Sequence, residues 1–252
     1  MPSVKHRSHS TIPMVVGKPK PMDVPYHPPS PLPEGSHSLY VCGGPNQGKT
    51  TLLLALLLSK PTKKHPERPR YYNKFFDSID VISPSIETLP VGQMGLAQEK
   101  LHGEFTDGVL QSIIDREHDA PNRHSLVLID DAIHEVGTCP PSILKACLNR
   151  RHCTHDSTQE GRASLSIWIT SQHYRMLAPR CRANMSHLVL FGTRNRQQRD
   201  AIRTEVMHDL TDRECQEVFK IAWSTPHGFL FVDLTRDRDQ RYYANFSPIA
   251  FE

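Results

Sequence analysis

The chain has 252 residues and a formal net charge of +3 at pH 7, with 37% hydrophobic and 23% charged residues. This length allows one α/β domain with a full core but excludes two large ones, and the mild charge leaves any nucleic-acid partner to be argued from local clusters. The longest apolar run, 52–58, is far shorter than the ~20 residues of a membrane span, so we expect no membrane insertion.

Residues 1–36 predict a disordered, proline-rich tail. Nine of the 21 prolines lie in it, and it shows neither helical nor strand periodicity. Its start is polar and lacks the apolar core of a signal peptide, so we expect a protein that is not secreted and stays in a reducing compartment. The six cysteines are then expected to be thiols. Residues 37–252 are predicted to form the folded domain.

A phosphate-binding loop is the most informative feature of the chain. After a strand predicted at 39–42, residues 43–50 read GGPNQGKT, an instance of G-x-x-x-x-G-K-[ST], and a helix is predicted at 49–58. Small residues allow backbone N–H groups to surround a triphosphate, Lys49 is expected to reach the β- and γ-phosphates, and Thr50 to bind Mg²⁺. The alternative is a chance glycine-rich turn. The predicted nucleotide-binding residues are Gly43, Gly44, Pro45, Asn46, Gln47, Gly48, Lys49, Thr50 and Thr51.

A pair of acidic residues follows further along the chain. Beyond a proline-broken basic loop at 60–70, a strand at 79–82 and a helix at 106–118, the sequence 125–131 reads SLVLIDD. Its apolar run predicts a strand at 126–129 that is buried on both faces, and ligands bind at the carboxyl ends of such strands. We expect Asp130 to hold Mg²⁺ and Asp131 to orient the attacking water, which favours hydrolysis. Alternatively, Asp131 caps the next helix.

A second polar strand end supplies another candidate. After a helix predicted at 141–150, the strand predicted at 165–169 runs into Thr-Ser-Gln. Placed beside the strand of the phosphate-binding loop, the amide of Gln172 can accept from water and donate to the γ-phosphate. The alternative is an amide in a surface turn. Two more strands, at 188–191 and 229–232, and two helices, at 196–207 and 211–223, complete the predicted elements; Thr211 and Glu214 have capping-box spacing.

This alternation of strands and helices predicts an α/β fold of the P-loop NTPase type, with a mainly parallel central sheet and helices on both faces. Several segments together resemble the poxvirus-type genome-packaging ATPases of the FtsK/HerA superfamily of P-loop motors, whose relatives occur in large DNA viruses, virophages and Maverick/Polinton-type elements. In chain order they are GGPNQGKTTLL (43–53), VISPS (81–85), LIDD (128–131), RH (151–152), ITSQ (169–172) and LAPRCRAN (177–184).

The resemblance spans roughly residues 36 to 250 and implies the additional-strand version of the fold, with Gln172 next to the phosphate-binding loop. It also implies a ring of identical subunits that uses ATP and Mg²⁺ to move double-stranded DNA into a capsid. Two features depart from the family pattern. Many members carry Glu where this chain has Asp131, and the large accessory domains of the bacterial translocases are missing.

Arginines are the remaining candidates for catalysis. A guanidinium that meets the charge on the γ-phosphate is typically worth 10³ to 10⁵ in rate. The candidates are Arg150, Arg151, Arg180 and Arg182; Arg151 ranks first because Arg-His at this place resembles the family pattern, and Arg182 ranks second. Arg150 and Arg180 fit surface ion pairs equally well. If the arginine acts on a neighbouring subunit, assembly becomes part of catalysis.

Two basic clusters are candidates for contacts to DNA phosphates, which carry no sequence information. One lies in the loop at 60–70 and the other around the start of the helix at 196–207. Their members are Lys60, Lys63, Lys64, Arg68 and Arg70, and Arg194, Arg196, Arg199 and Arg203. Either cluster is equally consistent with a merely solvated surface.

The sequence therefore predicts an ATPase that translocates double-stranded DNA and packages a viral genome, with capsid or portal proteins as partners, acting inside the cell at a virus assembly site or in the virion. Two alternatives remain open. One is a small nucleoside or nucleotide kinase, which the acid pair and Gln172 disfavour. The other is an ATP-binding virion assembly factor that is not a motor.

Overall fold

The computed structural model describes residues 4–6, 26–87, 89, 91–120, 124–132, 136, 138–150, 153 and 164–251. Most of the predicted disordered tail, residues 1–3 and 7–25, lies outside this set. Two parts of the predicted tail differ from the expectation: residues 4–6 form a strand that pairs with residues 249–251, and residues 26–36 pack against the domain. Leu32 is buried, the Tyr72 hydroxyl donates to the Pro33 carbonyl at 3.0 Å, and the Ser36 hydroxyl donates to the Leu165 carbonyl at 2.7 Å.

One twisted sheet organises the molecule, with strand order β1-β10-β9-β8-β7-β2-β6-β5-β3-β4. The strands from β7 to β4 run parallel to one another, while β8, β9, β10 and β1 extend the sheet in antiparallel fashion. Their bounds are β1 (Val4–His6), β2 (Ser38–Cys42), β3 (Ser78–Ile82), β4 (Leu101–His102), β5 (His124–Ile129), β6 (Ser164–Ser171), β7 (His187–Phe191), β8 (Phe229–Asp233), β9 (Tyr242–Ala244) and β10 (Ser247–Phe251).

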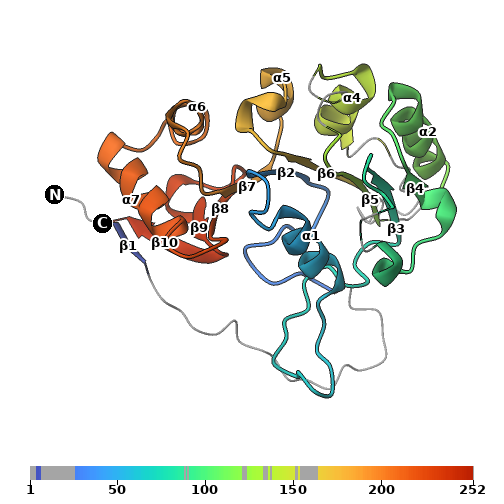
Figure 1. Cartoon of the computed structure of the whole chain (residues 1–252), viewed down its shortest axis with the longest axis horizontal. Helices are drawn as coiled ribbons and strands as arrows, with labels where there is room; N and C mark the ends of the chain where they lie inside the picture. Colours follow the sequence, from blue (N-terminus) through green and yellow to red (C-terminus); the bar gives the residue numbers. More distant parts are fainter. Residues whose placement is uncertain are drawn as a thin grey trace.

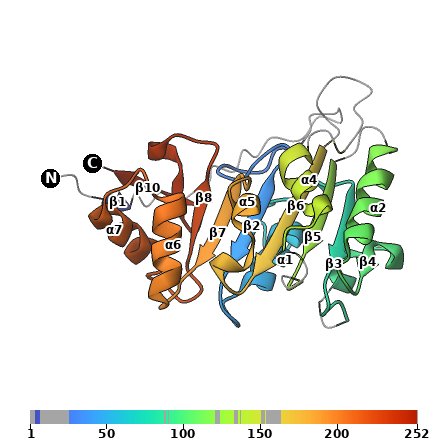
Figure 2. The same ribbon diagram turned by 90° about the horizontal axis from the view of Figure 1, so that it is seen from above.

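Helices cover both faces of this sheet. Figure 1 shows α1 on one face and α2, α4, α5 and α6 on the other, and Figure 2 shows these four helices side by side above the strands. The helices are α1 (Lys49–Leu58), α2 (Asp107–His118), α4 (Pro141–Asn149), α5 (Pro179–Arg182), α6 (Arg196–Val206) and α7 (Asp212–Ala222). The mainly parallel α/β fold that the sequence predicted is confirmed. Every predicted strand and helix occurs with ends within two residues of the predicted bounds, and Thr211 and Glu214 form the predicted capping box at α7.

The core has two parts, one on each face. On the α1 face, Leu53 and Leu56 pack with Val41 and Trp168; on the other, side chains of α2, α4, α6 and α7 pack with the opposite-pointing residues of the same strands. All residues of β2 and β6 are buried, which explains their unbroken apolar runs. The central strands are therefore a rigid support for whatever follows their carboxyl ends.

Cys139 and Cys181 form a disulfide, whereas Cys42, Cys147, Cys153 and Cys215 are buried thiols. The expectation of six thiols is thus wrong for one pair. The reason is spatial, since α5 brings position 181 beside the segment that precedes α4, and reasoning from composition and compartment does not see that approach. Separately, among the residues described above, no helix combines the length and apolar character needed to cross a bilayer.

Candidate active site

The phosphate-binding loop connects β2 to α1 in a conformation that its glycines permit. Gly48, the residue before α1, has φ of 97°, a left-handed value that glycine adopts without strain. At Gly43, a Cβ atom would lie 2.7 Å from the Cβ of Phe191, so no larger residue fits between β2 and β7. The Lys49 ammonium donates to the carbonyl oxygens of Gly43 at 2.6 Å and Gly44 at 3.2 Å. Lys49 is thereby held over the loop that a phosphate chain would occupy.

The acid pair follows β5, and one side chain of β6 organises it. Ile129 pairs with Ile169 across the two strands, so Asp130 comes next to Thr170. The Thr170 hydroxyl donates to Asp130 Oδ1 at 2.8 Å and accepts from the Asp131 N–H at 3.0 Å. The Thr170 hydroxyl therefore positions both acids, because it binds the side chain of Asp130 and the backbone of Asp131.

Asp130 is 5% exposed, and its environment bears on metal binding. Burial raises the pKa of the Asp130 carboxyl, and the neighbouring Asp131 adds to the rise, while the Thr170 hydrogen bond and the Lys49 charge oppose it. A raised carboxyl pKa marks a position where more positive charge would be stabilising. Carboxylate and hydroxyl oxygens also suit Mg²⁺, which binds through few protein ligands and keeps several waters. The residues present fit such an ion.

Asp131 and Gln172 meet above the ends of β5 and β6. Asp131 has φ of 56°, a left-handed conformation that is uncommon for a residue with a side chain and that clusters at functional sites. The Gln172 amide nitrogen lies 3.4 Å from Asp131 Oδ1. β6 lies between β2 and β5. The structure therefore brings Lys49, Asp130, Asp131 and Gln172 to one edge of the sheet, at the carboxyl ends of these three adjacent strands.

Two residues that sequence analysis did not single out also lie at this edge. Thr170 directly precedes Ser171 and Gln172, and its pairing with Asp130 depends on strand order and register, which the local sequence does not reveal. His227, from the turn before β8, lies 3.1 Å through Nδ1 from the Gln47 carbonyl oxygen. A histidine so far along the chain carries no sequence signal that connects it to the loop.

Three of the four candidate arginines lie among the described residues, and each contacts groups of its own chain. Arg182 is 6% exposed; its Nε and Nη2 each lie 2.8 Å from a carboxylate oxygen of Glu205, and it sits over the Tyr174 ring. The Arg182 guanidinium is therefore paired within its own chain. Arg150 and Arg180 donate to carbonyls of their own chain, those of Cys147 and Cys139 respectively, both at 2.9 Å. Arg151 lies outside the described residues.

The two basic clusters lie at different distances from the phosphate-binding loop. In the first, Lys60, Lys63, Lys64 and Arg68 are exposed, on the long connection that Figure 1 shows below α1, while Arg70 packs over the Tyr26 ring at 3.8 Å. In the second, Arg196 and Arg203 pair with Asp200, each at 3.7 Å. Arg194, by contrast, lines a cavity shared with Gly43 and Gly44. Only the second cluster therefore adjoins the phosphate-binding loop.

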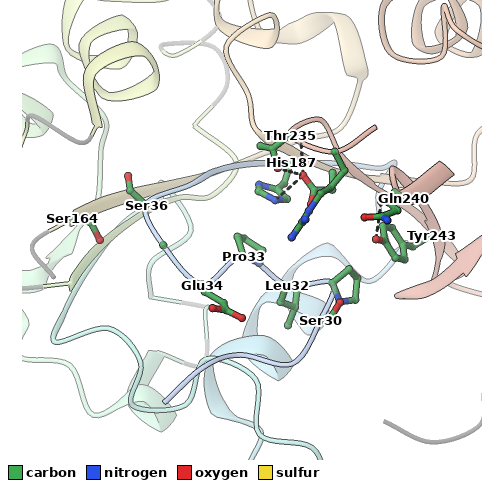
Figure 3. Close-up of a pocket in the computed structure, with 14 residues that line it drawn as sticks. Ser30, Leu32, Pro33, Glu34, Ser36, Ser164, His187, Thr235, Gln240 and Tyr243 are labelled. Atoms are coloured by element: carbon green, nitrogen blue, oxygen red, sulfur yellow. Dashed lines mark hydrogen bonds and ion pairs between the residues drawn. The ribbon is translucent and has the colours of Figure 1, made fainter. Parts of the chain in front are cut away.

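Two cavities stand out in the described part of the chain. One, of about 630 Å³, adjoins the phosphate-binding loop at the ends of β2, β6 and β7. The other, of about 810 Å³, lies at the opposite edge of the sheet; Figure 3 shows His187 and Thr235 within it. Burial alone would raise the pKa of Asp233 there, but hydrogen bonds from His187 and Thr235 lower it to about 2. Because no residue of the phosphate-binding loop lines this larger cavity, we place the candidate active site at the smaller one.

No protein-family model matches the chain, and no curated protein matches its sequence. Solved structures do share its fold. The genome-packaging NTPase B204 from Sulfolobus turreted icosahedral virus 2, in complex with AMPPCP, aligns with a TM-score of 0.58 at 14% identity over 83% of this chain and 96% of that one. B204 from Sulfolobus turreted icosahedral virus, described as a DNA-packaging ATPase, aligns with a TM-score of 0.56 at 13% identity over 83% and 97%. At such identities the likeness establishes the fold.

Proposed function

We propose that this protein is an ATP-hydrolysing motor that moves double-stranded DNA and packages a viral genome into a capsid. The observation that carries the proposal is the gathering of Lys49, Asp130, Asp131 and Gln172 at one edge of three adjacent strands. A cation, a metal-binding carboxylate, a second acid and an amide are the groups that hydrolysis of a terminal phosphate requires. The fold shared with the B204 packaging NTPases is consistent with it.

In this mechanism residues 43–51 surround the triphosphate and Lys49 exchanges its carbonyl partners for the β- and γ-phosphates. Thr50 and Asp130 would hold Mg²⁺, which when bound would neutralise charge on the phosphate oxygens. Asp131 orients the attacking water and takes up its proton, and Gln172 contacts both that water and the γ-phosphate. Thr170 keeps the two acids in place through its hydrogen bonds.

Assembly completes the site in this proposal. Of the four candidate arginines, Arg151 is retained as the residue that reaches the nucleotide of a neighbouring subunit, which requires a homo-oligomeric ring. The arginines around the start of α6 contact DNA phosphates near the nucleotide, and the lysines of the 60–70 loop add a second, more distant contact. Capsid or portal proteins are the remaining partners.

Phosphate release by the purified chain tests this proposal against its alternatives. We expect slow hydrolysis of ATP without any acceptor, a steep rise with protein concentration as rings form, and further stimulation by duplex DNA. The Lys49→Ala variant controls for contaminating ATPases. Turnover that requires a nucleoside acceptor would instead identify a kinase, and binding without turnover under any condition would identify an assembly factor that is not a motor.

The same assay separates the two basic clusters. We expect a variant with Arg196→Gln and Arg199→Gln, both on the exposed surface of α6, to lose stimulation by DNA while keeping its basal rate. A matched variant with Lys63→Gln and Lys64→Gln should lose less. Equal stimulation of both variants and the unaltered chain would remove these clusters from the account.

A further inference from the structure

The cavity beside the phosphate-binding loop extends beyond the space that phosphates need. It begins at Gly43, Gly44 and Gln47 and continues past the end of β7 to α6 and the end of α7. Its volume of about 630 Å³ is within the range of cavities that bind small organic molecules. The triphosphate alone does not account for it.

Position identifies which part of a nucleotide this space faces. The strand order is β7-β2-β6-β5, so Asp130 and Asp131 lie on one side of the loop strand and β7 lies on the other. The proposed metal ligand Asp130 and the proposed catalytic acid Asp131 follow β5, so the terminal phosphate would face β5 and β6. The nucleoside, at the other end of the phosphate chain, then extends toward β7 and into the cavity.

The lining suits a flat, largely apolar group with polar edges. Leu190, Ile202 and Trp223 provide apolar surface. The Trp223 ring is fixed before any ligand arrives, since it stacks on Phe219 at 4.4 Å between centroids and donates to the Leu190 carbonyl at 2.9 Å. Of the lining residues that the structure describes, none is acidic, so nothing there repels a polyphosphate.

Gln198 provides a polar group with a defined orientation. Its amide nitrogen lies 2.7 Å from His173 Nδ1, which leaves its carbonyl oxygen as an acceptor for an exocyclic amino group. Adenine carries such a donor at the position where guanine carries an acceptor. We propose that this cavity binds the base and ribose of the nucleotide, with Trp223 as its apolar wall and Gln198 as the residue that selects adenine; this inference rests on the proposed nucleotide site.

Calorimetric titration with ATP, GTP and tripolyphosphate tests the inference without any need for turnover. We expect the unaltered chain to bind ATP more tightly than GTP and far more tightly than tripolyphosphate. Gln198→Leu should weaken ATP binding roughly tenfold, the loss of about one hydrogen bond, and should leave tripolyphosphate binding unchanged. Gln197→Leu, on the exposed side of the same helix turn, is the matched control and should bind all three ligands like the unaltered chain.

Each other outcome has a defined meaning. If Gln198→Leu weakens ATP and tripolyphosphate equally, or changes neither, the base site is wrong while the proposed function stands. If the unaltered chain binds none of the three ligands, the proposed function falls as well. Photolabelling of the unaltered chain with 8-azido-ATP gives a second reading that no folding defect affects. We expect the label on peptides that contain residues 190–198 or Trp223, and label confined to other peptides would overturn the inference.

Discussion

The hydroxyl of Thr170 donates a hydrogen bond to Asp130 across two adjacent strands, at 2.8 Å. The same oxygen accepts the backbone N–H of Asp131. One side chain of β6 thus sets the orientation of the proposed metal ligand and of the proposed catalytic acid. We expect Thr170→Val to lower ATP turnover about tenfold, since it removes both bonds, and to raise the Mg²⁺ concentration needed for half-maximal rate.

Thr170→Ser is the control for this prediction, because it keeps the hydroxyl and should retain most of the activity and the Mg²⁺ requirement. Turnover measured across a Mg²⁺ series distinguishes the two variants. An equal loss in both would mean that the methyl group, and not the hydrogen bonds, matters at this position.

Asp131 tests whether hydrolysis depends on the second acid. We expect Asp131→Asn to bind ATP normally and to lose ~10² to 10⁴ in turnover, the usual contribution of a general base. Asp131→Glu restores a carboxylate and should keep measurable activity. Single-turnover phosphate release is the appropriate measurement, and unchanged release from Asp131→Asn would assign Asp131 a capping role instead.

The arginine assignment predicts a split between stability and activity. Arg182→Met should lower the free energy of unfolding by roughly 2–3 kcal/mol, because hydrogen bonds between charged groups are lost. Arg151→Ala should leave that free energy unchanged and lower DNA-stimulated turnover by ~10³.

Mixing two inactive variants tests whether Arg151 acts on the neighbouring subunit. An Arg151→Ala subunit keeps its nucleotide site, and a Lys49→Ala subunit keeps its arginine, so mixed rings should regain part of the activity. A mixture as inactive as its components would argue that Arg151 acts within its own subunit or not at all.

His37 predicts a pH dependence of stability. Its ring is buried among Tyr72, Phe76 and Trp168; its Nε2 accepts from the Trp168 indole at 2.8 Å, and Nδ1 lies 2.7 Å from the Gly35 carbonyl oxygen. Burial, with help from the nearby His187, lowers the pKa of His37 to about 3. In the unfolded chain His37 binds a proton near pH 6.5. The contribution of the neutral, buried ring to the free energy of unfolding is therefore complete above pH 6.5 and is lost as the pH falls toward 3.

Lowering the pH from 7 to 5 should reduce the free energy of unfolding by about 2 kcal/mol through protonation of His37 in the unfolded chain. Urea unfolding followed by tryptophan fluorescence measures it at both values. We expect His37→Gln to lose that part of the pH dependence, whereas His27→Asn, at an exposed position, should retain it. A His37→Gln variant with an unaltered pH slope would contradict the assigned neutral state.

Most of the fold was predictable because the pattern that encodes it is local. The apolar runs of β2, β5 and β6 are buried on both faces, and the motif at 43–50 specifies its own strand, loop and helix. The extra antiparallel strands β9 and β10 were missed because β9 has only three residues and β10 begins with Ser247 and Pro248. The packing of residues 26–36 was not predictable, because their high proline content is typical of a disordered tail and does not reveal that Leu32 is buried.

The candidate site was likewise predictable only where the local sequence encodes it. Lys49, Asp130, Asp131 and Gln172 each follow a recognisable strand, so their residue types and places pointed to them. Thr170, His227 and the Cys139–Cys181 disulfide depend on which strands and helices become neighbours. Arg182 was pointed to by its sequence context, but its pairing with Glu205 on another helix was not predictable from that context.

The most direct test of the central claim is a crystal structure of the full chain with AMPPCP and Mn²⁺, with the metal located by its anomalous scattering. We predict the triphosphate within residues 43–51, the metal at Thr50 and Asp130, and Asp131 and Gln172 facing the terminal phosphate. A nucleotide bound elsewhere, such as in the cavity beside His187, or a metal remote from Asp130 would contradict the account.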